Sequence, residues 1–409
     1  MMDPVAETTA GRTLRLAAPT VIYGGNRVRL LVNGEQYFPE LLAAIERARR
    51  VIEIETYIFA EDNIGIRVAF ALAAAASRGV EVRLLIDGFG GGEYARRLVH
   101  DLGVHGVQVR IYRPERWWRL ERKLLRRLHR KIAVFDEQLA FIGGINIIAD
   151  ENVPGPVRGR LGPRFDFAVA CEGPIVQPMT LAVRRLWWTL AIVGLRDRAG
   201  RLPTMRQLPR RPAIAGGVPA SLLLRDNLRN RRAIERAYLE ALELAREQVI
   251  VASAYFLPGR RFRAALLAVA ARGVRVVLLL QGQPEYALQF HAQRALYGQL
   301  LAGGVEIHEY TASYLHAKVA VVDDRWATVG SSNIDPYSLL LAREANVVVH
   351  DAGFARHLNA VLAEAIEQSS RRIRVADDER RSWLARARDW CAYFVVRLAT
   401  VVLARGRDY

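Results

Sequence analysis

The chain has 409 residues, a formal net charge of +17 and a pI near 10.4. This length accommodates two domains, and the charge favours an anionic partner, either a nucleic acid or an anionic membrane surface. The two cysteines, Cys171 and Cys391, lie far apart in the sequence. We therefore expect neither a disulfide framework nor a metal-ligand cluster, and we expect an intracellular protein. No apolar core of a signal peptide is recognisable in residues 1–20, and no uncharged apolar run reaches the roughly 18 residues of a membrane span.

Strands and helices are predicted to alternate along the first half. We expect a flexible leader at 1–26, a strand at 28–32, a turn at Asn33-Gly34 and a helix at 37–50. A strand at 51–59, a helix at 66–77 that ends near Gly79 and a strand at 80–86 follow. The glycine-rich segment 87–92 lacks the Lys-Ser/Thr pair of a nucleotide-binding loop, so we interpret it as a connecting loop.

The second half repeats this order. Helices are expected at 231–246 and 261–271, and strands at 249–256 and 276–280. The turn Arg272-Gly273-Val274 matches Arg78-Gly79-Val80. Alternating strands and helices predict a parallel or mixed sheet covered by helices on both faces. The fold class is therefore α/β, with two pseudo-symmetric lobes at 27–204 and 220–370 joined by a Pro- and Arg-rich linker at 205–219.

One short motif occurs in both halves. It reads His129 to Asp136 in the first and His316 to Asp323 in the second, with Lys131 or Lys318 two residues after the histidine. Both copies are rich in β-branched residues and are predicted to be strands, so each His and its Lys project from one face. The two aspartates come at acidic tight turns, where Asp binds nearby backbone N–H groups, so a structural role is an alternative to a catalytic one.

Each copy leads into a polar turn, Gly143-Gly144-Ile145-Asn146 or Gly330-Ser331-Ser332-Asn333. A single His-Lys pair is typical of a solvated strand edge, whereas a matched duplicate indicates an internal repeat whose copies face each other across a cleft. Such a cleft holds two imidazoles, two ammonium groups and two amides. Imidazole suits nucleophilic and acid–base work near neutral pH, and Lys and Asn donate hydrogen bonds to phosphate oxygens. This set fits transfer of a phosphoryl group at a phosphodiester.

The duplicated His-x-Lys-x4-Asp motif, each copy followed by a glycine-started turn ending in Asn, resembles the phospholipase D superfamily. Within it the chain resembles the bacterial cardiolipin synthases, and among these the B type, from about Val28 to about His357. The matching segments are residues 33–37, 128–132, 140–146, 172–176, 225–227, 254–256, 326–333 and 344–347. The resemblance implies two phospholipase D-like α-β-α sandwich lobes with the active site at their interface.

The resemblance also implies the roles of individual residues. His129 is expected to be the nucleophile and His316 the acid and base, with Asp166 orienting His129 and Glu344 orienting His316. The alternative for each carboxylate is a surface pair with its neighbouring arginine. The remaining site residues are Lys131, Lys318, Asp136 and Asp323 in the catalytic set, and Asn146, Asn333 and Ser331 as contacts of the substrate oxygens.

The implied reaction transfers a phosphatidyl group from one phosphatidylglycerol to another and needs no metal and no cofactor. Phosphatidylethanolamine is another possible donor. A hydrolase that passes the phosphatidyl group to water, a nuclease and a catalytically silent membrane scaffold are the alternatives. The intact duplicate motif argues against the scaffold.

Two basic segments with tryptophans favour a membrane surface. Residues 113–131 interleave Arg and Lys with Trp117 and Trp118, which suits anionic lipid, the alternatives being a nucleic-acid patch and a solvated helix face. The tail 371–409 is expected to be a basic amphipathic helix in the membrane interface, with Arg397 snorkelling, rather than a short span. The apolar segment 186–195 is expected to be a buried core helix. We predict peripheral attachment to the cytoplasmic side of a bacterial membrane, with no nucleic-acid partner; the oligomeric state stays open.

Overall fold

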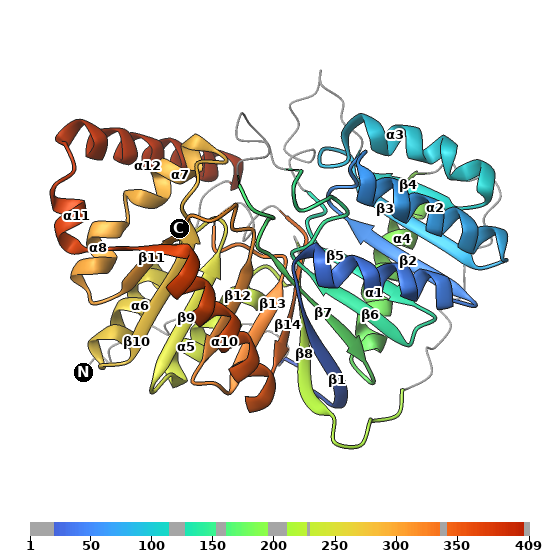
Figure 1. Ribbon diagram of the computed structural model, residues 1–409, viewed down its shortest axis with the longest axis horizontal. Coiled ribbons are helices and arrows are strands. Elements are labelled where there is room, and N and C mark those ends of the chain that lie inside the picture. The colour runs from blue at the N-terminus through green and yellow to red at the C-terminus, as the bar shows by residue number, and fades with distance from the viewer. Residues whose placement is uncertain are drawn as a thin grey trace, which may run out of the picture.

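The computed structural model describes residues 20–113, 127–152, 161–194, 211–226, 230–335 and 342–404. Two lobes lie side by side around one 15-stranded sheet formed by these residues, as Figure 1 shows. The strands of the first lobe are β1 (Tyr23–Val32), β2 (Val51–Thr56), β3 (Glu81–Asp87), β4 (Gln108–Tyr112), β5 (Lys131–Phe135), β6 (Leu139–Gly143) and β7 (Phe167–Glu172). Its helices are α1 (Asn33–Arg47), α2 (Asn63–Ser77), α3 (Gly92–Asp101), the 3₁₀ turn η1 (Gly103–His105) and α4 (Val176–Gly194).

The second lobe repeats this order and then extends it. Its strands are β8 (Val218–Arg225), β9 (Gln248–Ser253), β10 (Arg275–Gln281), β11 (Glu306–Tyr310), β12 (Lys318–Val322), β13 (Trp326–Gly330), β14 (Glu344–Val349) and β15 (Ser370–Ile373). Its helices are α5 (Ala233–Leu244), α6 (Arg260–Ala271), α7 (Ala287–Arg294), α8 (Tyr297–Ala302), α10 (Ala352–Ser369), α11 (Val375–Glu379) and α12 (Trp383–Ala404).

The strand order confirms the predicted internal symmetry. β1 and β8 pair antiparallel at the middle of the sheet. Outward from them the order is β7-β6-β5-β2-β3-β4 in one lobe and β14-β13-β12-β9-β10-β11 in the other. The strands that follow the two motif histidines, β5 and β12, therefore occupy equivalent places. The α/β fold with two pseudo-symmetric lobes is the one expected from the sequence.

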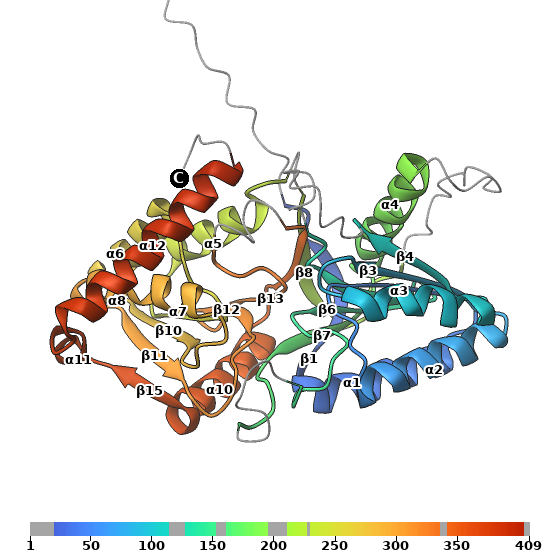
Figure 2. The ribbon, with the colours of Figure 1, turned by 90° about the horizontal axis from the view of Figure 1, so that it is seen from above.

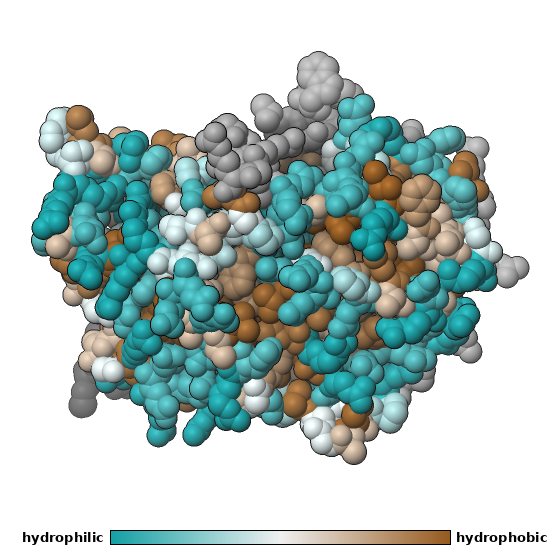
Figure 3. Space-filling view, in the orientation of Figure 1, coloured by the Kyte–Doolittle hydropathy of each residue, from teal (hydrophilic) through white to brown (hydrophobic). Residues whose placement is uncertain are grey.

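Three large hydrophobic clusters, and a small fourth one between β3, β4 and α4, hold the sheet. One packs α1, α2 and α3 against the first lobe, and a second packs α5, α6, α7 and α8 against the other. The third contains residues of β5–β7, β12–β14, α4 and α10, and so joins the lobes. Figure 2 shows α1–α3 and α4 on opposite sides of the first lobe's strands. On the face seen in Figure 3, apolar residues gather along the boundary between the lobes. A shared core of this kind fixes the two halves of the site relative to each other.

Several boundaries differ from those expected. β1 begins at Tyr23, inside the expected leader, because the strand continues outward to pair with β8. Asn33 starts α1 instead of a turn, with a left-handed φ of 58°. The end of the expected linker, from Val218, lies in β8, and residues 371–373 of the expected tail lie in β15, which adds to the sheet edge beside β11.

The tail helix α12 is partly built into the second lobe. Ala392 and Tyr393 are buried against it, and the buried Asp389 carboxylate pairs with Arg381 and with Nδ1 of His291, at 3.0 Å. The opposite face exposes Trp383, Leu384, Trp390, Phe394, Val395 and Leu398. None of the described helices is long and apolar enough to cross a membrane. By contrast, Leu186 and Trp187 of α4 are buried, as expected for a core helix.

Candidate active site

The two motif histidines lie at the lobe interface, and each is held by backbone from the other half of the chain. The His129 and Arg130 amides both donate to the Arg343 carbonyl, at 3.0 and 2.8 Å. In the equivalent arrangement the His316 amide donates to the Phe165 carbonyl at 2.8 Å. The segments leading to β5 and β12 thus each form a short parallel bridge with the segment before β14 or β7.

These backbone bridges between the lobes decide which carboxylate is hydrogen-bonded to each imidazole. Nδ1 of His129 lies 3.0 Å from Glu344 Oε1, and Nδ1 of His316 lies 2.5 Å from Asp166 Oδ2. The prediction that Asp166 orients His129 and Glu344 orients His316 is therefore wrong: the pairs are crossed. Glu344 directly follows Arg343 and Asp166 directly follows Phe165, so the backbone bridges carry each carboxylate to the opposite histidine. Both carboxylates are buried, so the surface pairs with arginine do not form.

The electrostatics keep both imidazoles neutral in the free enzyme. Burial lowers the pKa of His129 despite the opposing charge of Glu344, and it lowers the pKa of His316 further, with Lys318 and Arg164 adding to the effect. Burial also raises the pKa of Asp166 to about 6, so this carboxylate is ionised at neutral pH. Each carboxylate accepts from Nδ1–H, which leaves the Nε2 lone pair for chemistry.

The two lysines lie beside the histidines, as the two-residue spacing predicts. Lys131 Nζ donates to the His129 carbonyl at 2.7 Å, and Lys318 Nζ donates to the His316 carbonyl. Both side chains are buried, and burial lowers the pKa of Lys131 to about 7 and that of Lys318 to about 8. Two desolvated ammonium groups at one interface attract an anion strongly, because little solvent screens them.

The polar turns bring Asn146 and Asn333 to the same interface, where both are buried. Asn146 Oδ1 accepts from the Ile58 amide at 3.1 Å, which leaves its NH₂ group as a donor. Asn333 Oδ1 has no hydrogen-bond partner among the described residues. These amides are suitable donors for the non-bridging oxygens of a phosphate.

Ser331 has a different task from the predicted one. Its buried hydroxyl donates to Glu344 Oε2 at 2.5 Å, so it positions the carboxylate and does not face a substrate oxygen. Its counterpart is Gly144, and a Cβ atom there would overlap Asp166 Oδ1. The departure of the first half from the Gly-Ser pattern therefore makes room for the carboxylate that His316 needs.

Asp136 and Asp323 lie at the far ends of β5 and β12 from the histidines. Asp136 accepts from the backbone N–H groups of residues 49, 50 and 51, and Asp323 from those of residues 246, 247 and 248. Their φ angles of 50° and 51° belong to the tight turns that the sequence indicates. The structure does not bring them to the reacting groups, and the structural alternative accounts for them.

Sequence reasoning missed the residues that anchor the histidine segments. Asp87 Oδ2 accepts from the Leu128 amide at 2.7 Å, and Gln281 Oε1 accepts from the Leu315 amide at 3.2 Å. Asp87 ends β3 and Gln281 ends β10. The repeat therefore shows that the two residues occupy equivalent positions, but their different residue types hide the shared role. Tyr57 was also missed: its ring centroid lies 5.0 Å from that of His129.

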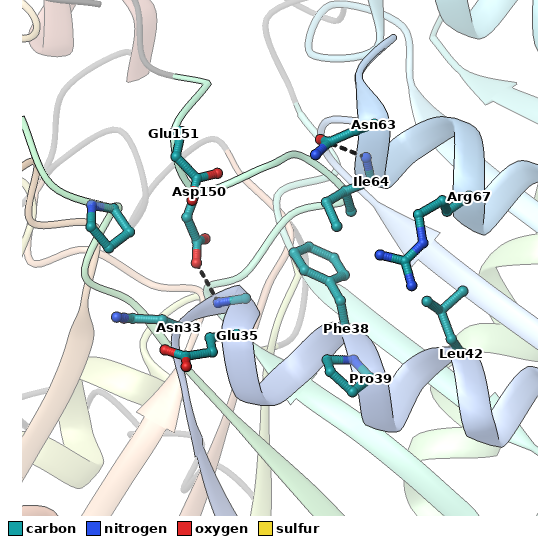
Figure 4. Close-up of a pocket in the computed structure, with 12 residues that line it drawn as sticks. Asn33, Glu35, Phe38, Pro39, Leu42, Asn63, Ile64, Arg67, Asp150 and Glu151 are labelled. Carbon is teal, nitrogen blue, oxygen red and sulfur yellow. Dashed lines mark hydrogen bonds between the residues drawn. The ribbon is translucent and has the colours of Figure 1, made fainter. Parts of the chain in front are cut away.

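A separate cleft of about 350 Å³ opens between the starts of α1 and α2, as Figure 4 shows. Its charged lining consists of the carboxylates of Glu35, Asp150 and Glu151 and the single guanidinium of Arg67. Asp150 Oδ2 accepts from the Gly34 amide at 2.7 Å, which occupies the N-terminus of α1. This acidic balance disfavours a phosphate, so the phosphodiester site remains the histidine interface. Over the described residues, no group of His, Cys, Asp and Glu has an arrangement that could hold a metal ion.

Comparison with known proteins agrees with this geometry. The family model described as "Cardiolipin synthase, PLD-like domain" matches residues 41–152 and 238–366, which contain both motif histidines. The chain belongs to this family. Cardiolipin synthase B of Escherichia coli K12 is 41% identical over 361 residues, covering 84% of this chain and 82% of the relative. Cardiolipin synthase B of Salmonella typhi is 37% identical over 385 residues, covering 91% and 88%.

A solved structure matches the fold. Phosphatidylserine synthase of Haemophilus influenzae superposes with a TM-score of 0.66 over 92% of this chain and 94% of that chain, at 13% identity. This likeness over nearly the whole of both chains confirms the two-lobed architecture inferred from the repeat. Members of the cardiolipin synthase family are phosphatidyltransferases, so the resemblance drawn from the motifs is confirmed at the level of the family and of its reaction type.

Proposed function

We propose that this protein is a cardiolipin synthase that joins two phosphatidylglycerol molecules through a phosphatidyl-histidine intermediate. The observation that carries the proposal is the pair of buried imidazoles, each hydrogen-bonded to a carboxylate of the opposite half, with two buried lysines beside them. Curated relatives named cardiolipin synthase B, 37–41% identical over most of the chain, support it.

In the first step, His129 Nε2 attacks the phosphorus of one phosphatidylglycerol. A P–N bond forms, the P–O bond to glycerol breaks, and His316 gives a proton to the departing glycerol oxygen. His316 acquires that proton as the substrate binds: the cations that lower its pKa are offset by the anionic phosphodiester. The negative charge of Glu344 stabilises the positive charge that His129 gains.

In the second step, the hydroxyl of another phosphatidylglycerol replaces glycerol. His316 takes the hydroxyl proton, the oxygen attacks phosphorus, the P–N bond breaks, and cardiolipin leaves with His129 regenerated. Lys131, Lys318, Asn146 and Asn333 donate to the non-bridging oxygens in both steps, where the phosphoryl charge is greatest. One phosphodiester replaces another, so no external energy source enters.

The proposed membrane contact uses the exposed face of α12. Trp383 is 75% exposed, Phe394 62% and Leu398 64%, and the exposed Arg386 and Arg388 lie on the same helix. Apolar side chains with neighbouring cations suit the headgroup region of an anionic bilayer. Attachment of this kind to the cytoplasmic surface of a bacterial membrane presents the interface to its lipid substrates. The Trp117-Trp118 segment lies outside the described residues.

The catalytic proposal is tested with vesicles of labelled phosphatidylglycerol, in EDTA and without nucleotide. We expect equimolar cardiolipin and glycerol from the wild type and neither from His129→Ala or His316→Ala. Phosphatidic acid as the sole lipid product would establish a hydrolase instead, and DNA cleavage without lipid turnover would establish a nuclease.

The membrane contact is tested by co-sedimentation with the same vesicles. Phe394→Glu is expected to reduce binding at least fivefold, because it places a charge in the apolar face of α12. Phe70→Glu is the matched control, since Phe70 is 72% exposed on α2. Equal binding of both variants would contradict a role for α12.

A further inference from the structure

The two halves of the site match in their histidines and lysines but differ at several flanking positions, three of which carry a polar side chain on one side only. The sheet register pairs Gly143 with Ala168 and Gly330 with Asn346, which makes Asp166 equivalent to Glu344. Two residues earlier, Arg164 is therefore equivalent to Ala342.

The other two positions follow in the same way. The hydroxyls of Thr56 and Ser253 each donate to a carbonyl two residues on, which makes Ile58 equivalent to Tyr255. The anchors Asp87 and Gln281 are equivalent, so four residues after them Gly91 corresponds to Glu285. Arg164 comes from the first lobe, and Tyr255 and Glu285 come from the second. At the equivalent places on the other side of the site the chain has Ala342, Ile58 and Gly91.

The three polar residues form one cluster on the His316 side. Tyr255 Oη donates to Glu285 Oε2 at 2.8 Å. The charge of Arg164 acts on Tyr255, on His316 and on Lys318, and that of Glu285 acts on Lys318 as well. Arg164 lies two residues before Asp166, which bonds His316, and Glu285 lies four residues after Gln281, whose side chain accepts from the Leu315 amide. The cluster is therefore near the group that handles the proton of the leaving and incoming alcohols.

Among the described residues, Arg164 has few of the partners that a buried guanidinium requires. It is only 8% exposed, and its Nη2 donates to the Asn152 carbonyl at a long 3.4 Å. Its Nε has no hydrogen-bond partner among the described residues. Leaving a buried cationic donor unpaired is costly, whereas an anionic phosphate oxygen satisfies it with a strong charge-assisted bond.

We propose that Arg164, Tyr255 and Glu285 bind the headgroup of the acceptor lipid, with Arg164 holding its phosphate and the Tyr255–Glu285 pair holding its glycerol. This assignment rests on the proposed cardiolipin synthase function. The attacking hydroxyl and the acceptor's own phosphate are separated by one glycerol unit, so both can be held while the hydroxyl meets His316. The leaving glycerol of the first step uses the Tyr255–Glu285 part alone, because it has no phosphate.

The same asymmetry gives a reason for the roles of the histidines. The Arg164, Tyr255 and Glu285 cluster lies on the His316 side, so in this assignment the alcohols enter and leave there. His316 is then the acid and base, and His129, whose ring packs against Tyr57, is the nucleophile.

The test compares three acceptors for the phosphatidyl-enzyme in phosphatidylglycerol vesicles. These are a second phosphatidylglycerol, which gives cardiolipin; labelled glycerol, which returns labelled phosphatidylglycerol; and water, which gives phosphatidic acid. We expect Arg164→Ala to lower cardiolipin formation at least tenfold and glycerol exchange less than threefold, and Arg164→Lys to recover part of the loss. Glu285→Gln and Tyr255→Phe should slow the first step and so lower all three products, because the donor's glycerol uses the same pair. They should also shift the products of the phosphatidyl-enzyme from cardiolipin and labelled phosphatidylglycerol towards phosphatidic acid.

Arg67→Ala, which removes an exposed arginine from the acidic cleft, is the control for loss of one positive charge. Equal loss of all three transfers in Arg164→Ala, at an unchanged melting temperature, would overturn the assignment, as would unchanged cardiolipin formation. If Arg164→Ala does not fold, Glu285→Gln decides through the ratio of the two alcohol transfers to hydrolysis, and an unchanged ratio would overturn the assignment. Failure of the wild type to make any cardiolipin would refute the proposed function itself, and the assignment with it.

Discussion

The crossed carboxylate pairing predicts that Glu344→Gln behaves as a defect of His129 and not of His316. Glu344 is fully buried and lies 3.0 Å from Nδ1 of His129, which becomes cationic as its Nε2 bonds to phosphorus. At an effective dielectric of about 20, two unit charges at this separation attract by about 5 kcal/mol. The neutral amide keeps a hydrogen bond but not the charge, so the barrier should rise by about 3–5 kcal/mol. This lowers the rate of P–N bond formation by roughly 10²- to 10⁴-fold.

The assay uses a phosphatidyl ester of p-nitrophenol, whose release needs little protonation. A single-turnover burst of p-nitrophenol reports the first step alone. We expect Asp166→Asn and His316→Ala to give bursts within about tenfold of the wild type, because the acid is dispensable for this leaving group. The burst of Glu344→Gln should remain slowed by the same factor, relative to the wild type, as its first step with phosphatidylglycerol. His129→Ala should give no burst.

If each histidine were paired with the carboxylate of its own half, Asp166→Asn would share the defect of His129→Ala, and Glu344→Gln would behave like His316→Ala. Rescue of Glu344→Gln by p-nitrophenol, together with a persistent defect in Asp166→Asn, would refute the crossed arrangement. Circular dichroism of all four variants controls for loss of the fold, since each change is made at the interface of the lobes.

Three further outcomes follow from the site. Burial holds the pKa of Lys131 at about 7 and of Lys318 at about 8, and the charged forms are lost as pH rises through these values, so kcat/KM should fall on the alkaline side from about pH 7 in a pH-rate profile. Gly144→Ser should lower kcat at least tenfold without unfolding, because its Cβ displaces the Asp166 carboxylate, and loss of activity in Ser331→Gly only would contradict this. Asp136→Ala should cost about 2 kcal/mol in urea unfolding, since three backbone N–H groups lose their acceptor, and should change kcat less than threefold.

The sequence carries the fold and the catalytic groups in its repeat. The matched strands and the His-Lys spacing predict the two lobes, their equivalence, and the placing of Lys131 beside His129. The register of the repeat does not say which carboxylate reaches which histidine, because same-half and crossed pairs are equally symmetric. Only the backbone bridges from Arg343 and Phe165 to the histidine segments decide between them.

Other differences have a similar origin. Ser331 lies in a motif whose hydroxyl suits a phosphate, and its use by Glu344 depends on packing between β13 and β14. Arg164 is a charged residue two positions from a site carboxylate, which in a sequence is typical of a surface pair. Its burial results from the approach of the second lobe, which local patterns do not encode. The structure near the C-terminus also depends on tertiary contacts, because β15 forms by pairing with the open edge of β11.

The backbone exchange between the lobes bears on how such a molecule arises. A single copy of the repeat would have an imidazole without a carboxylate and a carboxylate without an imidazole. Two copies related by a twofold axis complete each other at two places at once, so an ancestral homodimer would already have been a working enzyme. In a single chain the two halves need not be equal, so one side of the site can carry Arg164, Tyr255 and Glu285 while the other carries small or apolar residues. The present chain, cut in the linker between α4 and β8, should be active only when both fragments are mixed.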